Sequence, residues 1–326
     1  MSQQENMALV LACGELKLEK RPVPELCPGD VLLKMGFVGI CSTDVHFWSE
    51  GKFGDWVVKK PLVLGHEASG TVVKVSCGVN HLKAGDKVTI EPIVPRENDE
   101  YVRIGRYNLS PTCFMAGFPP DDGAMCRYYV HKANYCYKLP ECVCLEEGAL
   151  VEPLCVALHA CQRGRVKVGQ KVFICGAGPI GLLTLLVCKA IGVTLIVVCG
   201  LLWAEVILKG RRLTGNGCND YVTTDCIRNS SCEAIACNIN IGHCLLRWHT
   251  AIALLASKKV DVKPLITHRF GLEQAQEGFE CVKKGAGIKA VINCEQQQCP
   301  SLCPQNQCGQ QQSQCQTRQC PQHSFF

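Results

Sequence analysis

A glycine-rich turn between a short apolar strand and an apolar helix restricts the fold of this chain more than any other feature. Residues 171–175 (KVFIC) have the composition of a buried strand, and Gly176, Gly178 and Gly181 follow at the spacing G-x-G-x-x-G. The first glycine permits a tight turn, the second lets a pyrophosphate approach the backbone, and the third allows close packing of helix on strand. The helix N-terminus then faces the anion. We predict a dinucleotide site built from Gly176, Gly178, Pro179, Ile180 and Gly181.

The segments that follow this turn predict a βαβ unit. Residues 182–192 are an apolar run of helix length, and residues 193–198 (VTLIVV) follow as a second strand. Two strands joined by such a helix are parallel with a right-handed crossover, so we expect a doubly wound parallel sheet of the α/β class. An acidic residue that binds the ribose hydroxyls is expected at the end of the second strand. The strand instead ends in Cys199-Gly200 and the next acid is Glu205, so the ribose contact is missing or displaced.

Short β-rich runs dominate residues 1–156. Examples are residues 30–40, 71–75 and 86–92, which are separated by turn signals such as Gly-Asp pairs. Many short strands between such turns are typical of a Greek-key or barrel-like domain. We therefore expect a β-rich domain in front of the parallel sheet.

The pattern of the chain changes twice after the second strand. Residues 199–249 show no sustained period of 2 or 3.6 and carry six Cys, so the pattern assigns no element there and leaves open whether the segment folds. Residues 251–294 regain a regular order of helix, strand, amphipathic helix and strand. Residues 295–326 hold 12 Gln and 5 Cys, a low-complexity composition that does not supply a core, the alternative being a tail that binds soft metals.

Composition argues against several classes of protein. The chain has 326 residues, 47% hydrophobic content and a net charge of +5, but no Lys/Arg run that would indicate nucleic-acid binding. The N-terminus has no basic region followed by an apolar stretch, so we expect no signal peptide and a cytoplasmic protein. The 26 cysteines are then not a disulfide framework. Residues 172–203 are long enough to span a bilayer, but Lys189 and the Gly/Pro pattern favour strand–turn–helix–strand, so we predict no membrane span.

The stretch PLVLGHEASGTVVKV (residues 61–75) places an imidazole and a carboxylate side by side at His66-Glu67. A catalytic zinc takes three protein ligands and keeps one position open, and Cys41 in VGICSTDVH can supply a soft third ligand. Taken singly, Cys41 also fits a buried thiol and His66 a hydrogen-bonded core histidine. Their combination with a dinucleotide loop favours metal-assisted oxidation of an alcohol, because that reaction needs a Lewis acid while the hydride leaves for the cofactor.

Long motifs of this chain match a known enzyme family. They are VGICSTDVHFW (38–48), VKKPLVLGHEASGTV (58–72), IEPIVPRENDEYVRIGRYNLSP (90–111), PPDDGAMCRYY (119–129), LPECVCLEEGALVEPL (139–154), CGAGPIGLLTLLVCKA (175–190) and LLASKKVDVKPLITHRF (254–270). These stretches resemble the zinc-dependent medium-chain dehydrogenases, specifically their polyol (sorbitol) dehydrogenase branch. The resemblance covers about 1–198 and 251–294.

The resemblance implies four parts of the chain. They are a β-rich GroES-like catalytic domain at 1–156, a shortened Rossmann dinucleotide-binding domain at 157–250, a C-terminal return to the catalytic domain at 251–294, and the Gln/Cys-rich tail at 295–326. Relative to the family, the cofactor domain lacks roughly 50 residues. The strands after the second and an Arg-Tyr substrate segment have no counterpart in 199–250.

The resemblance also implies the metal and the cofactor. Cys41, His66 and Glu67 match the catalytic zinc ligands of the family, and Glu152 matches the glutamate that reaches the zinc-bound water or the substrate. Related alcohol dehydrogenases bind a structural zinc through four cysteines in a lobe that corresponds to residues 95–108 (PRENDEYVRIGRYN), which contain no cysteine here. The resemblance therefore implies one catalytic zinc per chain, no structural zinc, NAD as cofactor and a homotetramer.

Three further site residues follow from the same resemblance. Thr43 and His46 match positions associated with hydroxyl and proton-relay contacts, although His46 alone also fits a surface histidine. Phe47 falls where the polyol enzymes have a tyrosine that contacts the substrate, so one polar contact to a polar ligand is lost.

Two functions stay open from the sequence. The first is an active enzyme that oxidises a secondary alcohol of a sorbitol-like polyol with zinc and NAD and gives a ketose. The second is a catalytically inactive relic that keeps the zinc site but does not bind NAD productively. A Cys-rich metal-storage or membrane protein is a remote third hypothesis.

Overall fold

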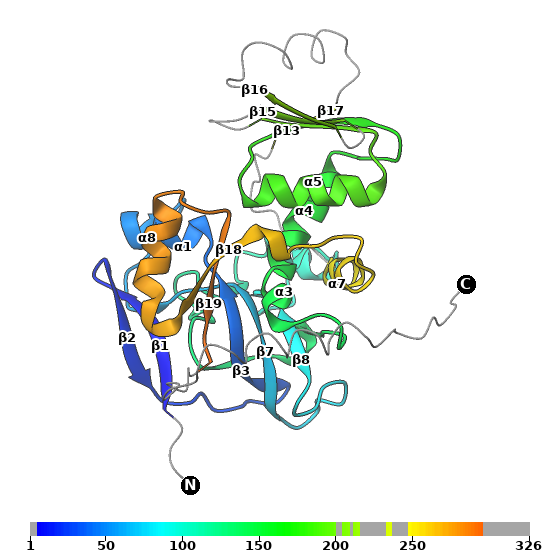
Figure 1. Cartoon of the computed structure of the whole chain (residues 1–326). Helices are drawn as coiled ribbons and strands as arrows, with labels where there is room; N and C mark the ends of the chain where they lie inside the picture. The colour runs from blue at the N-terminus through cyan, green and yellow to red at the C-terminus, as the bar shows by residue number, and fades with distance from the viewer. Residues whose placement is uncertain (1–4, 200–203, 209–210, 216–232, 237–246, 296–326) are drawn as a thin grey trace, which may run out of the picture. The chain divides into compact units, whose positions relative to one another are not determined.

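Strand β3 (Asp30–Gly39) lies inside the largest sheet and organises the N-terminal half of the chain (Figure 1). The computed structural model describes residues 5–199, 204–208, 211–215, 233–236 and 247–295. In it, β3 pairs antiparallel with three strands, β7 (Glu67–Val75), β11 (Tyr128–Lys132) and β19 (Lys289–Asn293). The sheet runs in the order β12-β8-β7-β3-β19-β18, with β11 also on β3. Its remaining members are β8 (Lys87–Ile90), β12 (Cys136–Lys138) and β18 (Ile266–Gly271).

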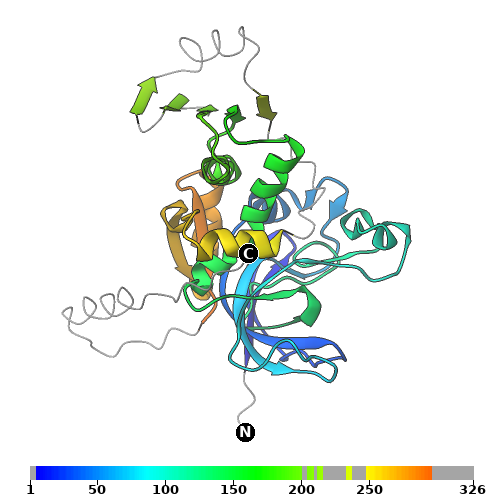
Figure 2. The ribbon, with the colours of Figure 1, turned by 90° about the vertical axis from the view of Figure 1, so that its right-hand side faces the viewer.

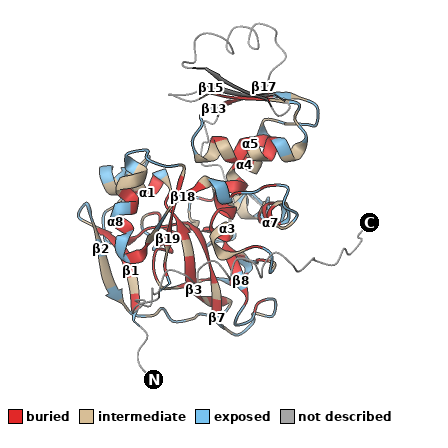
Figure 3. Ribbon diagram, viewed as in Figure 1, coloured by how far each residue is buried: buried red, intermediate tan, exposed pale blue. Residues whose placement is uncertain are grey.

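The strands predicted at 30–40, 71–75 and 86–92 are confirmed as β3, β7 and β8. Strand β7 begins earlier than predicted, so the His66-Glu67 pair lies at its start. Most of β3 is buried, because helix α3 (Leu145–Ala149) contacts the sheet in addition to its strand neighbours (Figure 3). Near-continuous apolar sequence in β3 agrees with burial of both of its faces.

Smaller sheets and short helices complete this half. Strands β1 (Asn6–Ala12), β2 (Glu15–Arg21) and β6 (Leu62–Val63) form a three-stranded sheet. Two two-stranded pairs are β4 (Lys52–Phe53) with β5 (Trp56–Val57), and β9 (Ile93–Val94) with β10 (Phe114–Met115). The helices are α1 (Ser42–Glu50), α2 (Glu100–Arg103), α4 (Val151–Arg163) and the 3₁₀ turns η1 (Tyr107–Leu109) and η2 (Ala133–Tyr135).

The predicted βαβ unit is confirmed. Strand β13 (Lys171–Cys175), helix α5 (Pro179–Ile191) and strand β14 (Leu195–Cys199) follow one another, and the two strands are parallel. Helix α5 packs on one face of these strands (Figure 2). The helix begins after Gly178 and ends at Gly192, whose φ of 96° is a left-handed conformation that glycine adopts without strain.

The described parts of residues 199–250 form strands, although the sequence pattern there assigned no element. Strands β15 (Ala204–Leu208) and β16 (Arg211–Gly215) pair antiparallel beside β14, and β17 (Glu233–Ala236) pairs parallel with β13. The order is β16-β15-β14-β13-β17, so the parallel part has three strands. The connection from β14 to β15 is too short for a parallel crossover, which needs about a dozen residues, so an antiparallel neighbour replaces the next parallel strand.

The last described segment returns to the first sheet. Helix α7 (Trp248–Ala256), the 3₁₀ turns η3 (Lys263–Leu265) and η4 (Leu272–Gln274) and helix α8 (Ala275–Lys283) accompany strands β18 and β19. The helix–strand–helix–strand order predicted for 251–294 is thereby confirmed. The division of the chain at 156, 250 and 294 stays a prediction, because the residues up to Glu295 cluster as one unit. All but the first residue of the predicted tail, 295–326, lies outside the described residues.

Two hydrophobic clusters form the core. The first fills the space around β1, β3 and β8 and includes Phe47 and Phe279 of the helices α1 and α8. The second joins α3 and α4 to β13, α5 and α7, and several buried cysteines pack in it as small apolar side chains. Cys199 is disulfide-bonded, which is one exception among cysteines that were not predicted to form a disulfide framework. Within the described residues, no helix is long and apolar enough to cross a membrane.

Hydrogen bonds to one buried acid hold the cysteine-free lobe at residues 95–108. Tyr107, in η1, donates a short hydrogen bond to Glu91, and Tyr137 donates to Glu91 Oε2 at 2.7 Å. Asp99 caps α2 and accepts from Ser110 Oγ at 2.6 Å. Burial raises the pKa of Glu91 to about 7, and the two tyrosine hydroxyls only partly offset it. The lobe is therefore held by a carboxyl group whose protonated form is stabilised by burial in the folded protein.

We predict that Glu91 makes the free energy of unfolding fall as pH rises. Because its pKa is raised in the fold, its contribution is complete below about pH 4.5 and is lost as pH rises through about 7, by at most about 3 kcal/mol. Glu91→Gln removes this titration. Urea unfolding at pH 4.5, 6 and 7.5, with a metal chelator present throughout, should show a steeper decline in the parent protein than in the variant. Equal pH slopes would contradict the prediction.

Candidate metal centre

Three side chains of metal-ligand type converge at the end of β3 and the start of β7. One ligand atom from each of Cys41, His66 and Glu67 lies within 4.8 Å of the other two, so a single ion can reach all three. His66 and Glu67 are buried and Cys41 is half-buried. This is the one group of three or more such side chains found among the described residues. The structure therefore brings together the three residues predicted to hold zinc.

Local backbone geometry explains this convergence. Cys41 is the N-cap of α1, directly after β3, and Glu67 pairs with Gly39 in the β3–β7 register. A Cβ atom on Gly39 would overlap the Glu67 carboxylate. Gly65 has a φ of 98°, and a Cβ atom there would meet the Met125 side chain at 2.6 Å. Glycine at position 39 therefore makes room for the Glu67 carboxylate, and glycine at position 65 lets the backbone turn against Met125 just before His66.

Asp44 orients the cluster, and the sequence analysis missed it. Its fully buried carboxylate accepts the N–H of Cys41 at 2.9 Å and of Gly65 at 3.2 Å. Asp44 Oδ1 also lies 3.5 Å from His66 Nδ1. Burial lowers the pKa of His66, whereas the charges of Asp44 and Cys41 raise it. The raising contributions together exceed the effect of burial, so the net shift of the pKa is upward. The available signal was the position of Asp44 three residues after a helix N-cap.

Glu67 also has a buried cationic partner that the sequence analysis missed. Lys289 Nζ, on β19, lies 2.6 Å from Glu67 Oε1 and 2.5 Å from Oε2. Only the contact with Oε1 has hydrogen-bond geometry, since Oε2 has no hydrogen-bond partner. No local sequence signal could have found Lys289, because it follows Glu67 by 222 residues.

Glu152 and Thr43 lie close to the cluster, as the resemblance implied. Glu152 is buried in the first turn of α4. Burial raises its pKa to about 7, while the charge of His66 lowers it and that of Glu67 raises it again. A carboxyl group with this pKa can hold or release a proton near neutral pH. Thr43 is buried, and its Oγ1 accepts from Cys41 Sγ at 3.6 Å.

An aromatic wall lies on one side of His66. Phe118 packs edge-on against the His66 ring at a centroid distance of 5.4 Å, and Phe47 packs edge-on against Phe118 at 5.2 Å. Phe47 is fully buried, and Phe118 was missed by the sequence analysis. His46 instead lies exposed on α1, where Nδ1 is 2.7 Å from Glu50 Oε1. This placement agrees with a surface histidine, and its role as a proton relay stays a prediction.

The predicted phosphate turn has the geometry that its glycines suggested. Gly176 has a φ of 117°, and a Cβ atom on Gly181 would overlap the Gly176 carbonyl oxygen. Gly178 is the N-cap of α5 and Pro179 is its first residue. Nothing lies within 4 Å of a Cβ atom placed on Gly178, so its backbone is open to approach. Strand β14 ends at Cys199 without an acid, and the next acid, Glu205, lies on β15 in register with Val198, so a displaced ribose contact stays a prediction.

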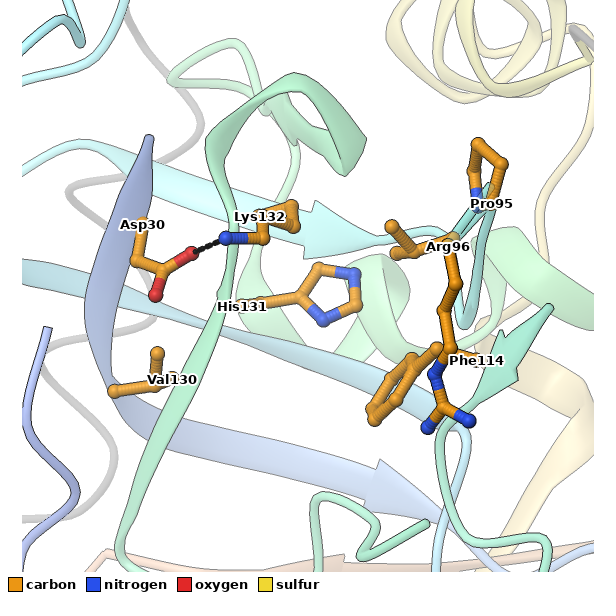
Figure 4. A pocket seen from close by; sticks show the side chains of 8 residues that line it. Asp30, Pro95, Arg96, Phe114, Val130, His131 and Lys132 are labelled. Atoms are coloured by element: carbon orange, nitrogen blue, oxygen red, sulfur yellow. Dashed lines mark ion pairs between the residues drawn. The ribbon is translucent and has the colours of Figure 1, made fainter. Parts of the chain in front are cut away.

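One cavity has a lining that includes none of the three residues of the metal cluster. It has a volume of about 390 Å³ and is lined by Asp30, Val94, Pro95, Arg96, Phe114, Val130, His131 and Lys132 (Figure 4). Lys132 Nζ is paired with Asp30 Oδ1 at 2.6 Å, and Arg96 is paired with Asp121. The charges of its two cations are thereby balanced by the protein itself.

The sequence of this chain is similar to those of known dehydrogenases. The model of the alcohol dehydrogenase GroES-like domain matches residues 27–141, which include the cluster. Sorbitol dehydrogenase of Mus musculus is 46% identical over 345 aligned positions, which cover 89% of this chain and 96% of the relative. Sorbitol dehydrogenase of Homo sapiens is 46% identical, covering 90% and 97%.

This chain belongs to the zinc-dependent medium-chain alcohol dehydrogenase family. Among solved structures of similar fold, an oxidoreductase of unknown specificity from Escherichia coli has a TM-score of 0.75 at 28% identity and covers 90% of this chain and 100% of its own. The 2R,3R-butanediol dehydrogenase of Bacillus subtilis has a TM-score of 0.69 at 23% identity, covering 88% and 99%. The predicted family and its GroES-like fold are thereby confirmed.

The alignment also shows that this medium-chain dehydrogenase is shorter than its relatives. Since 89% of 326 residues is about 290, about 55 of the 345 aligned positions of the mouse relative fall opposite gaps. That these positions fall in the cofactor domain, as predicted from the resemblance, stays a prediction.

We predict that Cys41→Ala and His66→Ala each abolish stoichiometric zinc binding, because two ligands do not hold zinc against water and buffer. Metal content after dialysis, measured by atomic emission, should fall from about one zinc per chain to near zero. Cys142→Ala, at an exposed cysteine, is the matched control. Unchanged zinc in the two variants would refute the ligand assignment.

We predict that Asp44→Asn weakens zinc binding by about 10- to 100-fold, which is typical for loss of a group that orients a metal ligand. The amide keeps the size of the side chain. Its single oxygen cannot replace both carboxylate oxygens that accept the two backbone N–H groups, and it carries no negative charge to stabilise a positively charged His66. Competition with a chromophoric chelator measures the affinity directly. Ser49→Ala, at an exposed position of the same helix, should leave it unchanged. Parent-like affinity in Asp44→Asn would contradict an orienting role.

Proposed function

We propose that this chain is a zinc- and NAD-dependent dehydrogenase that oxidises a secondary hydroxyl of a sorbitol-like polyol to a ketone, which gives a ketose. One observation carries the proposal. A three-ligand cluster of thiol, imidazole and carboxylate lies at the predicted positions of a chain that is 46% identical to sorbitol dehydrogenases over nearly their whole length.

The donor set fits zinc. Sulfur, imidazole nitrogen and carboxylate oxygen are the ligand types of catalytic zinc, and three ligands leave one position for the substrate. In the proposal Cys41, His66 and Glu67 hold the metal, and the lobe without cysteine holds none. Bound there, zinc supplies a Lewis acid for the substrate hydroxyl, and NAD accepts the hydride.

The remaining side chains bind, orient and move protons. Asp44 fixes the backbone of Cys41 and Gly65 through two hydrogen bonds, and its carboxylate faces His66 Nδ1 at 3.5 Å without a hydrogen bond. In the proposal Glu152 takes up a proton from the substrate side, because a carboxyl group with a pKa of about 7 exchanges a proton near neutral pH. Phe118 excludes water from one side of His66.

The glycine turn at the start of α5 is proposed to bind the NAD pyrophosphate. Gly176 and Gly178 leave the backbone open, and the first amides of the helix face the anion. Because β14 ends in Cys199 instead of an acid, we expect weaker ribose recognition than the family pattern provides. The cytoplasmic location and the tetramer implied by the resemblance stay predictions.

Binding of NAD to the purified, zinc-loaded chain tests the proposal. Isothermal calorimetry should show saturable binding, and addition of sorbitol should produce NADH absorbance. Cys41→Ala should lose turnover but keep NAD binding, because the glycine turn is built from other residues. About one zinc per chain with no detectable NAD binding would contradict the proposal and favour an inactive relic.

A further inference from the structure

An ammonium group is buried directly against a candidate zinc ligand. Lys289 is 4% exposed and Glu67 is 2% exposed, and the lysine Nζ lies within 2.6 Å of both carboxylate oxygens. Lys289 Nζ also donates to the carbonyl oxygen of Ile40 at 3.3 Å. An ion pair on the protein surface contributes little to stability. In a buried ion pair such as this one, removal of one partner leaves the other as an uncompensated charge, which is strongly destabilising.

The surroundings of Glu67 leave its carboxylate little freedom. On one side the carboxylate faces Gly39, where a Cβ atom would overlap it. On another side it faces Lys289. The carboxylate that must offer an oxygen to an ion beside Cys41 and His66 is therefore the one that this ammonium contacts through both oxygens.

The buried acids near Lys289 outnumber this one lysine. Asp44 and Glu152 are buried near Glu67, and the charges of Glu67, Asp44 and Lys289 all act on Glu152. A divalent cation brought into this group balances the acids, but it also stands close to the ammonium. Like charges in a poorly solvated site repel strongly, since little water screens them.

We propose that Lys289 is the internal counter-ion of the metal site and tunes its affinity for zinc. It neutralises Glu67 when no metal is bound, yields one carboxylate oxygen when zinc binds, and then weakens the binding by repulsion. The C-terminal return thus contributes a positioning residue to a site built from the first half of the chain. The inference rests on the proposed zinc site, but it concerns affinity and stability instead of turnover.

Lys289→Met tests this role, because methionine keeps the length of the side chain and removes the charge. We expect zinc affinity, measured by competition with a chromophoric chelator, to rise at least about tenfold, since both the repulsion and the metal-free ion pair are lost. Lys289→Arg should stay within a few-fold of the parent. Lys284→Met, at an exposed lysine of the same segment, is the matched control.

Thermal unfolding of chelator-treated protein provides a readout that does not depend on zinc. Metal-free Lys289→Met should melt well below the metal-free parent, because Glu67 is then buried without a partner. The double variant Glu67→Gln/Lys289→Met should recover much of that loss, since neither charge remains. The double variant also keeps the test decisive if the single variant does not fold.

Three results would overturn the counter-ion role. They are zinc affinity in Lys289→Met that equals or falls below that of the parent, metal-free stability that does not change, and a double variant no more stable than the single one. Loss of affinity that arginine rescues would show instead that Lys289 holds Glu67 in its liganding position. A parent protein that binds no zinc would refute the proposed function, whereas the metal-free stabilities would still judge the ion pair.

Discussion

Compensation of buried charge beside strand β3 is the constraint on which the candidate site depends. Asp44, Glu67 and Glu152 are all buried, and an uncompensated buried carboxylate costs several kcal/mol. Each acid is compensated differently. Asp44 accepts two backbone N–H groups, Glu67 contacts Lys289, and Glu152 keeps a raised pKa that favours its neutral form. The elements that carry these groups must therefore meet at one place.

This requirement explains why the C-terminal return, at the end of the described chain, contributes to a site built from its first half. Strand β19 pairs with β3 through Val291 and Gly39, and the same pairing brings Lys289 beside Glu67. In the described residues the cofactor half has three parallel strands and an antiparallel extension, and the β13–α5 turn has the geometry that its glycines predict.

Sequence patterns predicted the parts of the site that depend on neighbours in the chain. His66 and Glu67 were found from their adjacency, and the glycine turn from its spacing between a strand and a helix. Cys41 was proposed as a soft third ligand, and the long motifs identified the family and with it Glu152. Patterns failed where pairing across the fold decides the outcome. The antiparallel strands β15 and β16 gave no periodic signal, and Phe118 gave no signal as a neighbour of His66.

The sequence by itself determined the local chemistry of this protein, which comprises a tight turn that only glycines permit, the ligand pair at the start of a strand, and a second strand that ends without an acid. These features depend on backbone torsions and adjacent residues, so they can be predicted from the sequence alone. Only the tertiary structure decided which charges share the buried site. Asp44 meets His66 and Lys289 meets Glu67 because electrostatic compensation depends on distance through space and on the exclusion of water. Neither quantity is encoded at any single position of the chain.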